Sequence, residues 1–89
     1  MMDRVIIDVR EPEEYATEHV SGAINVPLAT LLANPKQLTN VSKDVELVLY
    51  CRTGSRSAMA KNILTKLGFT NVINGVNKAQ VEAKFQGEA

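Results

Sequence analysis

The sequence predicts an α/β domain with a parallel sheet of about four short strands and helices on both faces. Strand-like and helix-like segments alternate along all 89 residues, and this order is typical of parallel strands joined by helical crossovers. The strand-like runs are short and nearly all apolar, as expected for strands covered on both faces. Apolar residues make up 45% of the chain, enough for a buried core. We therefore expect a single domain over residues 1–89.

The first half of the chain contains two predicted strands and two short helices. Residues 5–9 form an apolar, β-branched run that predicts a buried strand. Pro12 suits the first turn of a helix and acidic residues follow it, so we expect a helix from Pro12 to about His19. Residues 23–26 predict a second strand. The leucines that follow predict a short helix closed by Asn34-Pro35, then one helical turn around Gln37.

The middle of the chain contains the clearest strand and the longest helix. Residues 47–50 are continuously apolar and predict a buried strand. A helical pattern begins at Ser57, with apolar residues at spacings of three and four, and Gly68 suits its C-terminal cap. The face expected to be buried consists of Met59, Ala60, Ile63, Leu64 and Leu67.

The chain ends with a predicted short strand and a helix. Residues 72–73 form the strand, and Asn74-Gly75 predicts a turn that could also form a wall of a pocket. The helix is expected over residues 76–85, with Val81 and Phe85 facing inward.

Composition excludes several classes of function. Ten basic and ten acidic side chains cancel, so no global field attracts nucleic acid or an anionic membrane. One cysteine cannot form an internal disulfide, and no Cys/His cluster has metal-ligand spacing. No apolar stretch approaches the ~20 residues that span a bilayer. We expect a monomer without a metal or an organic cofactor.

Cys51 lies where the clearest predicted strand gives way to the longest helix. Loop N–H groups, the positive end of the helix dipole and two arginines all favour an anion there. We therefore predict a thiolate nucleophile with a pKa below the usual ~8.5. The alternative is a small apolar side chain closing a core strand, which the neighbouring arginines and glycine disfavour. The loop predicted to bind substrate and sulfur comprises Arg52, Thr53, Gly54, Ser55, Arg56 and Ser57.

The length of this loop separates two chemistries. Cysteine phosphatases and arsenate-reducing relatives place their arginine after five intervening residues, which gives a wide cradle for a tetrahedral oxyanion. Here four residues separate Cys51 from Arg56. The smaller ring favours a terminal sulfur on the cysteine over a phosphate.

The two loop arginines are expected to differ in role. Arg56 stands at the start of the helix, where a cation opposes the dipole unless an anion lies close. We therefore expect Arg56 beside the sulfur anion. Arg52 directly follows the cysteine and is expected to reach outward, where it would attract an anionic substrate.

Three ordered segments resemble the rhodanese family of single-domain sulfurtransferases over nearly the whole chain. Residues 8–15 (DVREPEEY) resemble its first signature, residues 18–27 (EHVSGAINVP) its second, and the six-residue loop opened by Cys51 has its active-site length. The resemblance implies a three-layer rhodanese-like fold and transfer of the outer sulfur of thiosulfate through a Cys51 persulfide.

Two departures from the common pattern resemble the short periplasmic rhodaneses of the bacterial phage-shock type. The chain has no room for a strand and helix before residues 8–15, and it lacks the tryptophan that often follows a Gly-Gly pair. The chain carries no targeting signal, so we expect a periplasmic protein if a leader has been removed and a cytoplasmic one otherwise. The implied donor is thiosulfate, and the implied acceptor is cyanide, a small thiol or a thiol protein such as a thioredoxin.

Three residues outside the loop are expected to support it. Asp8 ends the first strand, where a lone aspartate more often accepts hydrogen bonds that hold a loop than acts as a general acid. Arg10 is expected to pair with a helix carboxylate such as Glu14 rather than to reach the substrate. His19 matches a loop-fixing position of the second signature.

Two other functions stay open. One is a rhodanese-fold binding module without turnover, although inactive family members usually lack the loop cysteine. The other is a cysteine phosphatase or an arsenate reductase, which the loop length disfavours.

Overall fold

A four-stranded sheet with the order β2-β1-β3-β4 forms the centre of the molecule, and every neighbouring pair is parallel. This computed structural model describes residues 4–33 and 36–86. The α/β class and the parallel sheet expected from the sequence are confirmed. The strands are β1 (Arg4–Asp8), β2 (Ile24–Asn25), β3 (Glu46–Cys51) and β4 (Val72–Asn77).

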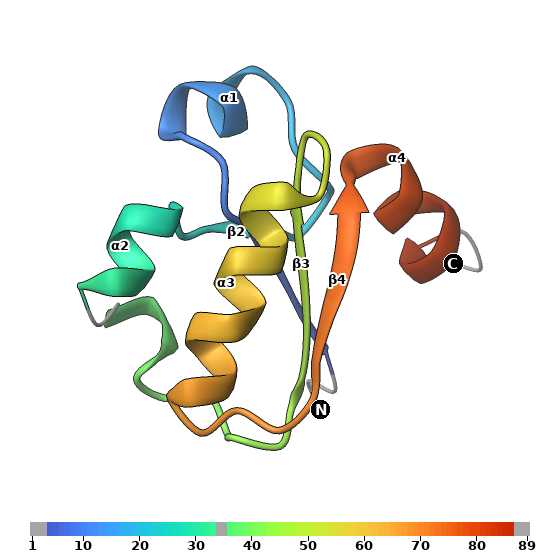
Figure 1. Ribbon diagram of the computed structural model, residues 1–89. Coiled ribbons are helices and arrows are strands. Elements are labelled where there is room, and N and C mark those ends of the chain that lie inside the picture. The colour runs from blue at the N-terminus through green and yellow to red at the C-terminus, as the bar shows by residue number, and fades with distance from the viewer. Residues whose placement is uncertain (1–3, 34–35, 87–89) are drawn as a thin grey trace.

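Helices cover both faces of the sheet and its carboxyl end. Figure 1 shows α1 above the carboxyl ends of the strands, and α2 and α3 together along one side. A turn around Gln37 was expected, and a 3-10 turn is present there. The helical elements are α1 (Pro12–Thr17), α2 (Leu28–Leu32), η1 (Lys36–Leu38), α3 (Ser55–Lys66), α4 (Lys78–Val81) and the π-helical η2 (Glu82–Gln86).

The two faces of the sheet pack into two separate hydrophobic cores, because successive side chains along each strand point to opposite faces. Odd-numbered residues of β1 and β3 point toward α3, and even-numbered ones point to the opposite face. The α3 side includes Ile7, Leu47, Leu49, Cys51, Ala60 and Leu64. The other side includes Ile6, Val48, Tyr50, Val20 and Val81, with Phe85 packed against it. This is the three-layer arrangement that the sequence predicted.

Helix α3 begins two residues before the Ser57 start that the sequence predicted. Gly54 adopts the left-handed conformation with φ 97°, and its carbonyl already accepts the helical hydrogen bond from Ala58 N at 2.9 Å. Ser55, Arg56 and Ser57 therefore belong to the first helical turn.

The predicted buried face of α3 is partly wrong. Ser57, Ala60 and Leu64 are buried and form the stripe that contacts the sheet. Met59 is 57% exposed and Leu67 is 41% exposed, because both lie to the side of that stripe. Spacings of three and four alone did not distinguish the contacting stripe from its flank.

Strand β4 is longer than expected and replaces the predicted turn at Asn74-Gly75. Leu49 pairs with Asn74 but Tyr50 pairs with Val76, so Gly75 forms a bulge. A Cβ at Gly75 would lie 2.6 Å from Val81 Cγ2 and 3.0 Å from Leu49 O. The bulge therefore requires glycine for space rather than for a turn.

Several other element boundaries differ from the prediction. The last helix starts at Lys78 rather than at residue 76, because Asn77 caps it by accepting a hydrogen bond from Gln80 N at 2.9 Å. Helix α1 ends at Thr17 and leaves His19 in the following loop. The expected end of the α2 helix at Asn34-Pro35 lies outside the described residues. Within the described ranges, no helix is long and apolar enough to cross a membrane.

Core packing predicts unequal costs for two leucine truncations. Leu64 is fully buried between α3 and the sheet, so Leu64→Ala leaves a cavity and should lower the free energy of unfolding by about 2–5 kcal/mol. Leu32→Ala is the matched control, because Leu32 is 71% exposed and its loss should cost less than about 0.5 kcal/mol. Urea unfolding measures both changes. Equal costs would contradict this assignment of the core.

Candidate active site

The Cys51 sulfur lies at the carboxyl end of β3 and at the start of the loop into α3. The residue is 2% exposed. Gly54 N–H donates a hydrogen bond to Sγ at 3.1 Å, and Ser57 Oγ lies 3.6 Å from the sulfur. A Cβ at Gly54 would approach Val76 Cγ1 to 3.1 Å. The loop therefore curls tightly around the sulfur, as the sequence led us to expect.

The environment of Cys51 lowers its pKa. Burial raises the pKa, because the thiolate loses its contact with water, but the surrounding donors outweigh that effect. These donors are the N–H and the hydroxyl of Ser57 and the N–H groups of Gly54 and Thr53. The thiolate is therefore stabilised mainly by hydrogen bonds from the loop and the first turn of α3.

Both loop arginines meet the carboxylate of Glu14, on α1. Arg56 donates to Glu14 Oε1 at 3.0 Å and to Oε2 at 3.3 Å, and Arg52 Nη1 lies 3.9 Å from Oε2. We expected Arg56 beside the sulfur anion. Instead its guanidinium is bound to Glu14, and it acts on the sulfur only through its charge. Arg52 reaches outward as expected, with its side chain 72% exposed.

Glu14 is held in place and ionised by these contacts. Its Oε1 also accepts a hydrogen bond from Glu11 N at 2.9 Å, at the start of α1. The hydrogen bonds from Arg56, together with that backbone donor, lower the pKa of Glu14 to about 2. The loop cations are therefore partly neutralised by a fixed carboxylate.

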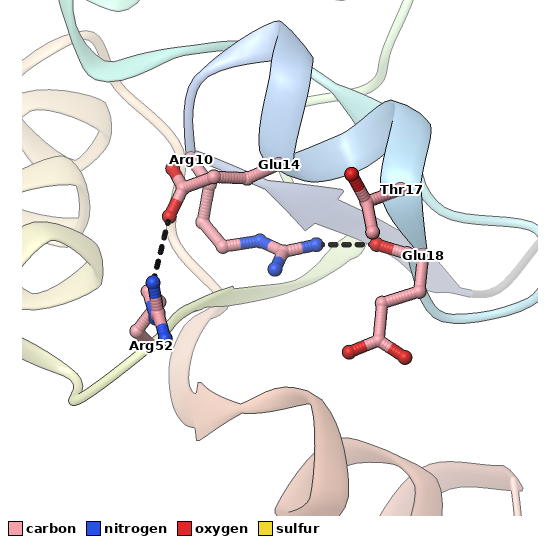
Figure 2. A pocket seen from close by; sticks show the side chains of 5 residues that line it. All are labelled: Arg10, Glu14, Thr17, Glu18 and Arg52. Atoms are coloured by element: carbon pink, nitrogen blue, oxygen red, sulfur yellow. Dashed lines mark hydrogen bonds and ion pairs between the residues drawn. The ribbon is translucent and has the colours of Figure 1, made fainter.

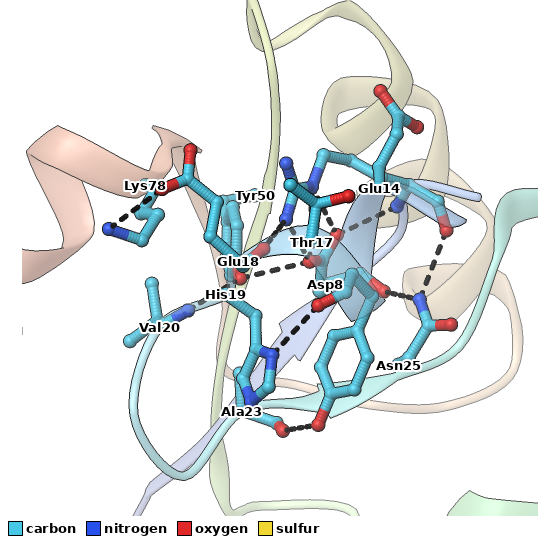
Figure 3. Close-up of polar contacts among 12 residues, drawn as sticks. Asp8, Glu14, Thr17, Glu18, His19, Val20, Ala23, Asn25, Tyr50 and Lys78 are labelled. Carbon is cyan, nitrogen blue, oxygen red and sulfur yellow. Dashed lines mark hydrogen bonds and ion pairs between the residues drawn. The ribbon is translucent and has the colours of Figure 1, made fainter. Parts of the chain in front are cut away.

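Asp8 is buried at the end of β1 and is surrounded by donors (Figure 3). It accepts hydrogen bonds from Arg10 N and Nε at 2.9 Å, from Arg10 Nη2 at 2.7 Å and from Tyr50 OH at 3.0 Å. The expected partner of Arg10 was Glu14, and this prediction is wrong, because Asp8 lies only two residues away and faces it. These contacts are those of a residue that holds a loop.

Tyr50 connects this network to the loop after α1. Its hydroxyl donates to Asp8 and accepts a hydrogen bond from Val20 N at 2.9 Å. Burial is the main reason that the pKa of Tyr50 is raised, so the hydroxyl stays protonated. The buried network therefore fixes the segment that carries His19.

His19 is exposed and packs against Tyr15 in the same segment. The two rings stack with centroids 3.8 Å apart. His19 Nδ1 lies 2.9 Å from Tyr15 O, and since a carbonyl can only accept, Nδ1 carries the proton. Figure 3 shows these contacts within the loop, where Tyr15 OH also donates to Ala23 O at 2.6 Å.

A hollow of about 250 Å³ lies beside the loop, between α1 and Arg52 (Figure 2). Arg10 Nη2 points into it and donates to Glu18 O at 2.7 Å. Cations and carboxylates both line this hollow, and the ion pair between Arg52 and Glu14 at 3.9 Å is the weakest contact among them. Its lining residues are Arg10, Glu14, Thr17, Glu18 and Arg52.

The sequence reasoning missed two residues of the site. Glu14 was considered only for the helix dipole and as a partner of Arg10. Its approach to Arg56 joins positions 42 residues apart, which no local pattern encodes. Asn74 was interpreted as part of a turn that could also form a wall of a pocket, but its contacts with Ser57 and Gly54 were not expected. The signal in the sequence that could have identified Asn74 as a site residue was its position directly after a predicted strand. Among the described residues, no three His, Cys, Asp or Glu side chains are grouped as metal ligands.

This fold and this cysteine loop define the class of protein. Residues 1–76 match the family described as the rhodanese-like domain, so the chain belongs to the rhodanese-like family. A solved structure of an Escherichia coli rhodanese with anions has a TM-score of 0.77 at 40% identity, covering 86% of this chain and 89% of that chain. The family expected from the sequence is confirmed, whereas one domain over residues 1–89 stays a prediction.

Several curated relatives of this chain are named as sulfurtransferases. The thiosulfate sulfurtransferase PspE of E. coli strain K12 is 45% identical over 69 residues, which are 76% of this chain and 64% of that protein. A sulfurtransferase of Allochromatium vinosum is 32% identical over 72 residues, covering 81% of this chain and 64% of that protein. The match therefore spans less than two thirds of both relatives. The human single-domain sulfurtransferase TSTD1 has a TM-score of 0.70 at 25% identity, covering 92% of this chain and 83% of that chain.

The pKa of Glu14 predicts part of the acid sensitivity. The carboxyl has a pKa of about 2 when folded, against an ordinary 4.5. Its contribution to stability is therefore present above about pH 4.5 and is lost as the pH falls toward 2. Glu14→Gln should lose less stability than the parent when urea unfolding at about pH 6 is compared with about pH 3.

Glu13→Gln is the control for this experiment. Glu13 is the exposed neighbour on α1, and no described residue forms an ion pair with its carboxylate. This variant should show the acid dependence of the parent. An unchanged acid dependence in Glu14→Gln would contradict the contribution of the Glu14–Arg56 pair.

Proposed function

We propose that this protein is a sulfurtransferase that moves the outer sulfur of thiosulfate, or of a related donor, to a thiol or to cyanide. The observation that carries the proposal is the Cys51 sulfur, buried at a strand end and surrounded by loop N–H groups that lower its pKa. A thiolate is the nucleophile that such a transfer needs. The thiosulfate sulfurtransferase named among the relatives supports the choice of donor.

In the first half-reaction, the Cys51 thiolate attacks the outer sulfur of thiosulfate. A bond forms between Sγ and that sulfur, and the S–S bond of thiosulfate breaks with its electron pair going to sulfite. The products are a Cys51 persulfide anion and sulfite, so the total charge of −3 is conserved. The N–H groups of Gly54 and of the first turn of α3 stabilise the negative sulfur throughout.

In the second half-reaction, an acceptor attacks the outer sulfur of the persulfide. Cyanide leaves as thiocyanate, or a thiolate leaves as a persulfide, and the electron pair of the broken S–S bond restores the Cys51 thiolate. Cys51 is the chain's single cysteine, so an acceptor thiol must come from another molecule. A small thiol or a protein thiol such as that of a thioredoxin meets this requirement.

The hollow beside Arg52 is our candidate for the sulfonate group of the donor. Arg52 is exposed, and its Nη1 lies 3.9 Å from Glu14 Oε2. An exposed ion pair of this length is weak. A thiosulfate dianion can therefore compete with Glu14 for this guanidinium. The location of the protein, periplasmic if a leader is removed and cytoplasmic otherwise, stays a prediction of the sequence.

Thiosulfate treatment should add one sulfur atom to the protein, roughly 32 Da, on Cys51. Cyanide should then remove that mass and release thiocyanate. Intact-protein mass spectrometry and a thiocyanate assay measure the two events. Cys51→Ser should lose both while its circular dichroism spectrum stays that of the parent.

Three results would contradict this function. A Cys51→Ser variant that still produced thiocyanate at the parent rate would remove Cys51 from the mechanism. Hydrolysis of aryl phosphates by the parent without sulfur transfer would favour a phosphatase, and retention of a protein partner without either activity would favour a binding module.

The two arginines should separate kinetically. Arg52→Ala should raise KM for thiosulfate about fivefold at low salt, because an exposed attracting charge is lost. Arg56→Ala should instead lower kcat about tenfold, because Glu14 loses its close partner, keeps only the long ion pair with Arg52 and opposes the sulfur anion. Steady-state kinetics with thiosulfate and cyanide distinguish the two effects.

A double variant tests the cause of the kcat loss. Adding Glu14→Gln to Arg56→Ala removes this carboxylate charge and should recover part of kcat. Lys61→Ala, an exposed cation of α3, is the control and should change neither constant. Lack of any recovery in the double variant would show that Arg56 acts on the sulfur by itself.

A further inference from the structure

Asn74 contacts both ends of the Cys51 loop from the bulge of β4. Its Nδ2 donates to Gly54 O at 3.2 Å. Its Oδ1 lies 2.6 Å from Ser57 Oγ and accepts a hydrogen bond from Val76 N at 3.0 Å. The Asn74 side chain therefore joins three parts of the site. These are Gly54, which donates to the sulfur, Ser57, which lies beside the sulfur in α3, and Val76 of strand β4.

The orientation of the Asn74 amide follows from its partners. Val76 N–H can only donate and Gly54 O can only accept, so Oδ1 must face the first and Nδ2 the second. The contact between Oδ1 and Ser57 Oγ is therefore a hydrogen bond donated by the serine hydroxyl. At 2.6 Å it is the shortest hydrogen bond that this hydroxyl makes.

The Ser57 hydroxyl is fully buried and has a single proton for three nearby acceptors. The acceptors are Asn74 Oδ1 at 2.6 Å, Gly54 O at 3.1 Å and Cys51 Sγ at 3.6 Å. When the sulfur is a neutral thiol, it can donate to Ser57 Oγ while the serine proton points to Asn74. When the sulfur is an anion, the serine proton can turn to it, and Asn74 Oδ1 keeps its bond from Val76 N.

Val76 shows that this part of the chain is held under strain. Its φ is 75°, in the left-handed region that a β-branched residue rarely adopts. The hydrogen bond from its N–H to Asn74 Oδ1 stabilises that conformation, and its Cγ1 packs toward Gly54. Strained backbone persists only where surrounding contacts hold it, and here those contacts, with Asn74 and Gly54, lie beside the Cys51 sulfur.

We propose that Asn74 is a positioning residue for the Cys51 sulfur, acting through the Ser57 hydroxyl and the Gly54 carbonyl. It holds the loop donors toward the sulfur, and its Oδ1 accepts the hydrogen bond of the Ser57 hydroxyl when that hydroxyl does not donate to the sulfur. The same loop geometry then serves the thiol, the thiolate and the persulfide without rearrangement. This inference rests on the proposed function for its role in turnover, but its test on the thiolate needs no sulfur donor.

Charged groups around the sulfur do not provide this positioning. Arg56 of α3 interacts with the sulfur only through its charge, as Glu11 does with Arg56, and its guanidinium is bound to Glu14 of α1. Asn74 is uncharged and contacts none of these groups directly. Its effect on Cys51 must therefore pass through Ser57 and Gly54.

The test is the pH dependence of Cys51 alkylation by iodoacetamide. Asn74→Ala should raise the midpoint by about one pH unit and slow alkylation about tenfold below it. The N–H and O–H donors of the loop would no longer be held toward the sulfur, which would stay buried. Asn74→Leu has nearly the same shape and no charge, but it can neither donate to Gly54 O nor accept from Ser57 and Val76, so it should also raise the midpoint. It serves as the second variant should the alanine variant fold poorly, as judged by circular dichroism.

Asn25→Ala is the matched control for a purely structural asparagine. Asn25 also bridges two backbone carbonyls, donating to Asp8 O and Arg10 O at 3.0 Å, and its strand β2 is separated from the Cys51 strand by β1. This variant should lower Tm without moving the alkylation midpoint. An equal shift of the midpoint in Asn25→Ala and Asn74→Ala would overturn the proposal, because general loosening would then explain both.

A double-mutant cycle with Ser57→Ala tests the route of the effect. In the Ser57→Ala background, Asn74→Ala should produce less than half of its shift in the parent. An undiminished shift there, or no rise of the midpoint in folded Asn74→Ala and Asn74→Leu, would overturn the proposal. In thiosulfate turnover, Asn74→Ala should lower kcat more than it changes KM. A parent protein without sulfur transfer would contradict the proposed function and leave the alkylation test valid.

Discussion

The buried sulfur of Cys51 must be satisfied by hydrogen-bond donors, and the turn from β3 into α3 is built around that requirement. Burial alone would favour the neutral thiol. The left-handed Gly54 turns its N–H to the sulfur at 3.1 Å, and the first turn of α3 adds further donors. Because β3 is paired on both sides, the starting point of this turn is fixed by the centre of the sheet.

Charge at the carboxyl end of the sheet is arranged in short, local pairs. Arg10 is neutralised by the buried Asp8 at 2.7 Å, and Arg56 by Glu14 at 3.0 Å. Arg52 is the loop cation with the longest and most exposed ion pair. The donors of the backbone therefore face the sulfur with little competition from side-chain cations, while one arginine stays accessible to an anion in solution.

The β4 bulge links the sheet to the chemistry of the loop. The extra residue, Gly75, displaces the register so that Asn74 faces the loop and Val76 takes a positive φ. Bulges often redirect a side chain beside a functional site. In this protein the redirected side chain is the amide that contacts Ser57 and Gly54.

By itself the sequence determined the alternating α/β order, the position of Cys51 between the clearest strand and the longest helix, and the polar loop after it. These features depend on neighbours within a few residues, so hydrophobic period and loop composition were sufficient. Only the tertiary structure decided that Arg56 pairs with Glu14, 42 residues away, and that Asn74 lies in a bulged strand. Both depend on how α1 and β4 pack around the end of β3, and such packing is set by contacts between segments far apart in the chain.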